Sequence, residues 1–184
     1  MTSIQHEKII HDTRHWLESA VIGLNLCPFA KAVHVKGQIY YAVSDAKDTE
    51  ALLDDLSVQL RELVALDESI RSTTLLMLPN VMQDFLDFND FLEIADALLT
   101  MLKLDGTLQI ASFHPHYQFA DTDTNDITNY TNRAPYPILH LLREDSVDVA
   151  VAAFPEAEDI FENNMVTMEK LGADGWAKLR IANT

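Results

Sequence analysis

Apolar residues recur every three or four positions in several stretches of the chain, which is the spacing of one face of an amphipathic helix. This spacing predicts helices over residues 3–22, 48–66, 85–104 and 158–171. Ser3 is expected to cap the first helix and Gly23 to end it, and the polar Asn89 marks a point where the third helix could break. Gly172 is the expected end of the last helix, and Trp176 is expected to dock the tail that follows.

Three shorter stretches, residues 35–43, 73–78 and 107–113, have the composition of strands. The second is continuously apolar and ends at Pro79, as expected of a strand that is buried on both faces of a parallel sheet. Gly37 interrupts the first stretch and indicates a bulge or an edge. The alternation of strands with helices predicts a three-layer α/β fold, with a small, mostly parallel sheet of about three strands and helices on both faces. We expect a single domain over residues 1–184.

The C-terminal third of the chain is expected to add further helices. An apolar run at residues 138–142 follows Pro135 and Pro137, and proline is favoured in the first turn of a helix. We therefore predict a helix there, with Asn132 near its cap. Residues 146–154 alternate in a way that suits a strand, but we favour a short helix ended by Pro155.

Composition narrows the possible partners. The chain has 13 Lys and Arg against 29 Asp and Glu, so its net charge of −16 makes nucleic acid and anionic membrane surfaces unlikely partners. The single cysteine, Cys27, excludes an internal disulfide and a cysteine-based zinc cluster. No stretch has the apolar length of a membrane span, and the N-terminus lacks the apolar core of a signal peptide, so we expect a cytoplasmic protein.

The polar loop that begins at Ser112 is the expected site, because ligands of parallel α/β sheets bind beyond the carboxyl ends of the strands. With only five glycines and no glycine-rich loop after a strand, a dinucleotide or P-loop site is disfavoured. His114 and His116 are spaced so that, in a strand, both imidazoles would point to one side. They are candidate catalytic residues and, with His140, candidate ligands of a divalent transition metal. The alternative is that they hydrogen-bond to the loop backbone.

An anionic ligand is a second hypothesis. Asn132 and Arg133 precede the predicted helix, whose N-terminus would favour a phosphate or carboxylate. On the predicted helix, His140, Arg143 and Glu144 would share one face. The alternative is that the two arginines pair with acidic residues of the loop and order it. Candidate substrate-binding residues are Tyr117, Asn129, Asn132, Arg133, His140 and Arg143.

Cys27 precedes Pro28, which forces an extended conformation at the exit of the first helix. A free cysteine in this position is more often packed as a small hydrophobe than presented to a pocket. With a loop histidine as base, and with Asn129 or Asn132 to orient it, Cys27 would instead be a nucleophile.

Three stretches, LNLCPFA at 24–30, QIASFHPHY at 109–117 and NYTNRAPYPILHLLRE at 129–144, resemble the bacterial proteins of domain-of-unknown-function family 1415. The sequence departs from the family pattern at Asp121, where the family has glycine, and at Ala134, where it has serine. The resemblance implies a bacterial cytoplasmic protein and no particular activity. Because Cys27, His114 and the Asn132–Arg133 pair all fall in the family's motifs, it favours a Cys27 that faces the site.

The leading hypothesis is a small-molecule enzyme, a hydrolase or transferase that acts on an anionic metabolite with Cys27, His114 and His116 as catalytic candidates. One alternative is a metal-binding protein that uses the three histidines named above. Another is a protein-interaction module, which predicts an exposed apolar patch near Tyr130, Tyr136 and Ile138.

Overall fold

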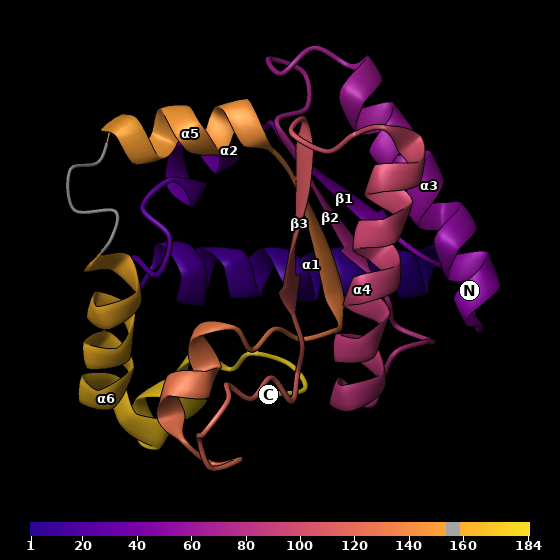
Figure 1. Cartoon of the computed structure of the whole chain (residues 1–184). Helices are drawn as coiled ribbons and strands as arrows, with labels where there is room; N and C mark the ends of the chain where they lie inside the picture. Colours follow the sequence, from indigo (N-terminus) through magenta and orange to yellow (C-terminus); the bar gives the residue numbers. More distant parts are fainter. Residues whose placement is uncertain (154–158) are drawn as a thin grey trace.

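A four-stranded sheet forms the centre of the molecule (Figure 1), seen in a computed structural model that describes residues 1–153 and 159–184. The strands are β1 (Ile39–Val43), β2 (Thr73–Met77), β3 (Leu108–Phe113) and β4 (Ile138–Arg143), in the order β1-β2-β4-β3. β1 and β2 are parallel, and β4 lies antiparallel between β2 and β3. The α/β fold class is confirmed, with one strand more than the sequence predicted. The expectation of a mostly parallel sheet is wrong, because β4 pairs antiparallel with both of its neighbours and only β1 and β2 form a parallel pair.

Helices cover both faces of this sheet. The helices of the described residues are α1 (Ser3–Trp16), the π-helix η1 (Leu17–Ile22), α2 (Ala30–Val35), α3 (Thr49–Ala65), α4 (Phe85–Leu102), the 3-10 helix η2 (Ile127–Thr131), α5 (Glu144–Ala153) and α6 (Ile160–Leu179). Leu56 of α3 and Phe88 of α4 pack with Leu139 on one face. Trp16 of α1 and Trp176 of α6 pack with Ile138 on the other. Two apolar cores, one on each side of the sheet, therefore hold the layers together.

Side-chain caps fix where the long helices begin. Thr2, not Ser3, caps α1: its hydroxyl accepts from the amide of Gln5 while Gln5 reaches back, which makes a capping box. The Asp48 carboxylate caps α3 by accepting from the amide of Ala51, and the Asp84 carboxylate caps α4 by accepting from the amides of Leu86 and Asp87. α4 continues unbroken through Asn89.

The predicted helix after Pro137 is wrong, because residues 138–143 form β4. This strand lies in the interior of the sheet, where an apolar run can be buried on both faces. Asn132 therefore caps no such helix, and His140 and Arg143 point to opposite faces of a strand. Glu144 is instead the first residue of α5.

Other boundaries also moved. Residues 30–35 form α2 and the first strand starts only at Ile39, because Gly37 takes a left-handed turn with φ of 69° between them. The short helix predicted over 146–154 is confirmed as α5 up to Ala153, while Phe154 lies outside the described residues. α6 runs past Gly172, which kinks it, so Trp176 belongs to the helix rather than to a tail.

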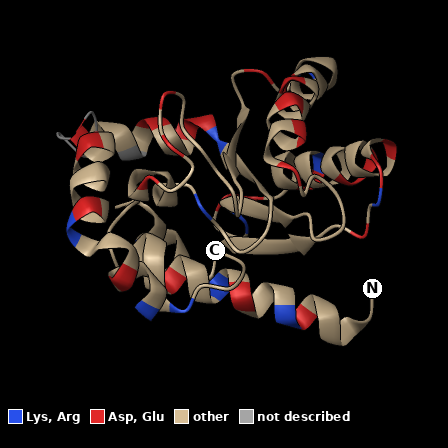
Figure 2. Ribbon diagram, turned by 90° about the horizontal axis from the view of Figure 1, so that it is seen from below, with Lys and Arg blue, Asp and Glu red and all other residues tan. Residues whose placement is uncertain are grey.

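Acidic residues are spread over most of the helices, and basic residues are few (Figure 2). Within the described residues, none of the helices is long and apolar enough to cross a membrane.

Candidate functional site

A pocket of about 210 Å³ lies where the chain leaves η1 and where β3 ends. It is lined by Val21, Leu26, Cys27, Ala111, Ser112, Phe113, Thr131, Asn132 and Asn164. All three stretches that carry the family resemblance contribute to this lining. The sequence also placed a site at the carboxyl end of this strand, and Ser112 and Phe113 stand at that end.

Cys27 is held at the pocket by backbone hydrogen bonds. The amides of Leu26 and Cys27 both reach the carbonyl of Val21, at 2.9 and 3.4 Å, so the chain folds back on the end of η1. The Asn164 side chain of α6 donates to the carbonyl of Leu26 at 2.9 Å and fixes the segment from the other side. The thiol is free and only partly buried. Cys27 therefore packs at the edge of the apolar core that contains Trp16 and also lines the pocket.

His140 lies next to the pocket wall. It sits on β4 opposite Ala111, and its ring centroid is 6.1 Å from that of Phe113; both neighbours line the pocket. Among the described residues the imidazole has no hydrogen-bond partner. Burial lowers the pKa of His140 to about 4, so the ring is neutral near pH 7. A neutral, unpartnered imidazole has one N–H that can donate a hydrogen bond and one nitrogen that can accept a proton.

His114 differs from His140 because both of its ring nitrogens are occupied. Nε2 donates to the carbonyl of Met82 at 3.1 Å, and Nδ1 accepts from the amide of His116 at 3.0 Å. These partners fix the neutral Nε2–H tautomer of a fully buried ring. Burial is the main reason that the pKa of His114 falls to about 4. His114 ties the start of the loop to the segment before α4, and the His116 side chain is exposed.

The loop between β3 and η2 is ordered by its own polar residues. The Asn129 carboxamide oxygen accepts from the amide of Phe119 and the hydroxyl of Thr122, and its nitrogen donates to the carbonyl of Asp123. Tyr117 packs against Phe119, with ring centroids 5.1 Å apart. Asn129 and Tyr117 thus hold the loop, and neither lines the pocket.

Arg133 and Arg143 are separated rather than paired around a ligand. Arg133 donates to the carbonyls of Tyr117 and Thr124, and its guanidinium lies 4.1 Å from the ring centre of Tyr130. Arg143 donates to three carbonyls near the end of α3, those of Leu63, Leu66 and Arg71. Both arginines bind the backbone, not acidic side chains of the loop. No Lys or Arg is among the residues that line the pocket.

Across residues 1–153 and 159–184, no three His, Cys, Asp or Glu side chains are grouped so that they could hold a metal ion. His114 and His116 lie with ring centroids 5.8 Å apart, but the nitrogens of His114 are bonded to the backbone. His140 lies on β4, and its ring centroid is 6.1 Å from that of Phe113. The metal hypothesis therefore has no ligand set in the part of the chain that is described.

Several pocket residues could not be identified from the sequence. Asn164 reaches the site from α6, far along the chain from Cys27, and it lies in an ordinary amphipathic helix. Ser112 and Thr131 are common residue types that carry no signal of their own. The indications were that Ser112 begins the polar loop expected to hold the site, and that Ser112 and Thr131 fall inside the stretches that resemble the family.

The chain belongs to the family described as protein of unknown function (DUF1415), whose model matches residues 8–178. This match spans the sheet and every residue of the pocket. No curated protein and no solved structure matches the chain.

Proposed function

We propose that this protein is an enzyme, a hydrolase or transferase that uses the Cys27 thiol as its nucleophile in the pocket at the end of β3. The observation that carries the proposal is the meeting of a free, partly exposed thiol with polar groups from distant parts of the chain. A cytoplasmic location, as the family resemblance implies, keeps such a thiol reduced.

Acyl transfer is the reaction class that this group of side chains suits best. Cys27 Sγ attacks a carbonyl carbon, the S–C bond forms, and the bond from that carbon to the leaving group breaks. His140 accepts the thiol proton and returns it to the leaving group. A water or a second substrate then releases the acyl group. The Asn132 carboxamide and the Ser112 hydroxyl supply hydrogen-bond donors for the oxygen that becomes negative.

The reacting group of the substrate is uncharged in this proposal. The anionic metabolite of the sequence analysis depended on Arg133 and Arg143, and both guanidiniums are bound to backbone carbonyls. A pocket without Lys or Arg, in a chain of net charge −16, opposes a buried anion.

The interaction-module alternative has less support. Ile138 is fully buried, and Tyr130 and Tyr136 are only partly exposed and pack against the same core as Trp16. The apolar patch that this alternative requires at these three residues is therefore absent.

Incubation with p-nitrophenyl acetate, followed by intact-mass measurement, tests the proposal. We expect one acetyl group per chain, with a burst of p-nitrophenol, and neither in Cys27→Ala. His140→Gln should slow the acetylation, and His11→Gln, which replaces an exposed histidine on α1, is the matched control. An unmodified wild-type chain, or equal acetylation of Cys27→Ala, would remove Cys27 from the proposed role.

A further inference from the structure

β3 is an edge strand, and part of its outer side is free. Along each strand of an antiparallel pair, the backbone N–H and C=O groups of alternate residues point toward the partner strand, and those of the residues between them point away from it. The amide of Glu144 donates to the carbonyl of Thr107, which shows that Thr107 faces β4. In the register of the two strands, Ile110 and Ser112 therefore point their N–H and C=O groups outward. Within the described residues these outward groups have no partner.

The protein already uses this outer side just beyond β3. The next outward amide, that of His114, donates to the carbonyl of Asn132 at 3.2 Å. Asn132 thus ends the free edge and also lines the Cys27 pocket. A strand added along Ile110 and Ser112 would continue the same ladder and reach the pocket at its end.

A second hollow, of about 480 Å³, flanks the start of the same strand. Leu108, Gln109 and Ile110 line it, whereas Ala111, Ser112 and Phe113 line the Cys27 pocket. The two hollows therefore follow one another along β3. Alternate side chains of a strand point to opposite sides, so a strand paired with β3 could place one side chain in each hollow.

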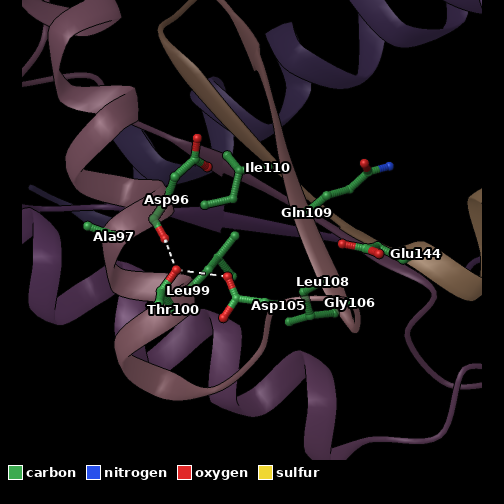
Figure 3. A pocket seen from close by; sticks show the side chains of 10 residues that line it. All are labelled: Asp96, Ala97, Leu99, Thr100, Asp105, Gly106, Leu108, Gln109, Ile110 and Glu144. Atoms are coloured by element: carbon green, nitrogen blue, oxygen red, sulfur yellow. Dashed lines mark hydrogen bonds between the residues drawn. The ribbon is translucent and has the colours of Figure 1, made fainter.

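The second hollow is acidic. Its polar lining includes the carboxylates of Asp96, Asp105 and Glu144, and none of its lining residues is Lys or Arg. The Thr100 hydroxyl donates to the Asp105 carboxylate at 2.8 Å, and this hydrogen bond, drawn in Figure 3, fixes the position of the carboxylate. Such a lining is complementary to a Lys or Arg side chain.

We propose that the substrate is an extended peptide segment that pairs with the free edge of β3, with a basic side chain in the acidic hollow. The part of this proposal that concerns Cys27 rests on the proposed function: the same peptide would present its reactive carbonyl to the thiol. Main-chain hydrogen bonds supply affinity, and the acidic hollow selects for the basic side chain.

The probes are two acetylated hexapeptide amides of alternating Thr and Val. One position is Lys in the first peptide and norleucine, its uncharged analogue, in the second. Binding is measured by isothermal titration calorimetry at low salt. The Lys peptide should bind roughly fivefold more tightly than the norleucine peptide, the effect of exposed ion pairs. Glu144→Gln with Asp105→Asn should remove this difference, and Asp90→Asn, an exposed carboxylate elsewhere on α4, should keep it.

Methylation of single peptide nitrogens tests the edge pairing without changing the protein. When the N-methyl group is moved along the peptide one position at a time, binding should weaken by about tenfold at every second position, because only alternate amides of the peptide face β3. Equal tolerance at all positions, or equal affinity of the two peptides, would overturn the proposal. Peptide binding needs no thiol chemistry. A reactive Cys27 without peptide binding would therefore refute only this inference, and peptide binding beside an inert Cys27 would refute only the proposed function.

Discussion

Replacing His114 by Gln should make the stability of the protein less dependent on pH. In the folded chain both ring nitrogens of His114 are bonded, and burial lowers its pKa to about 4, compared with an ordinary value of 6.5. Protonation would set an N–H of the ring against the amide of His116. The unfolded chain therefore binds this proton more readily than the folded chain.

The sign and size follow from proton linkage. The contribution of His114 is fully present above the unfolded pKa of 6.5 and is lost as the pH falls toward about 4. Between about pH 7 and about pH 5, one such histidine lowers the free energy of unfolding by about 2 kcal/mol. The pKa of His140 is lowered to a similar value, so the wild type should lose roughly twice this amount from the two rings.

Urea unfolding of the wild type and of His114→Gln, at about pH 7 and about pH 5, measures the difference. The variant should be less stable at the higher pH, by about 1–3 kcal/mol for each hydrogen bond left unmade. Its further loss on acidification should be smaller than that of the wild type by about 2 kcal/mol. His11→Gln reports the effect of removing an exposed ring. An equal loss on acidification in wild type and His114→Gln would refute the assignment of a neutral, buried His114.

Two further substitutions test how the framework is held. Arg143→Ala removes the donors to the carbonyls of Leu63 and Leu66 at the end of α3, so it should lower the free energy of unfolding in urea by about 2–4 kcal/mol. Arg143→Lys should recover part of that loss, and an unchanged urea midpoint of Arg143→Ala would contradict this role. Gly172→Ala should lower the free energy of unfolding by about 1–3 kcal/mol, because a backbone with φ of 62° and ψ of 174° is accessible almost only to glycine. The cost is conformational, since a methyl group at this position would meet no atom within 4 Å. An unchanged stability would show that the kink in α6 relaxes.

The sequence was sufficient for the elements with long or continuous patterns. α3, α4 and β2 lie almost where the apolar spacing placed them, because each buries one stripe or one run of side chains. β4 was mistaken for a helix because its Leu-rich run fits either period. Its strand conformation depends on pairing with β2 and β3, which are distant in sequence. The short length of the run, following Pro137, was the signal in favour of a strand.

The sequence predicted the place of the candidate site in the fold but not which residues line it. The polar loop does begin at the pocket, and Cys27 and Asn132 do meet there. Arg133 and His114 were chosen by residue type, but the backbone carbonyls and amides that occupy them are set by tertiary structure alone. His140 stood out as a polar residue in an apolar run, and its position beside the pocket wall depends on the pairing of β4 with β3.

The rate of Cys27 alkylation by iodoacetamide, in the folded protein and in urea at the same pH, tests the central claim most directly. Because Cys27 is the only cysteine, intact mass reports it without interference. A nucleophile assisted by His140 should react faster in the folded wild type than in the unfolded chain, and His140→Gln should remove most of that excess. A folded wild type that reacts more slowly than the unfolded chain would contradict the account, because Cys27 would then be a packed side chain and not a nucleophile.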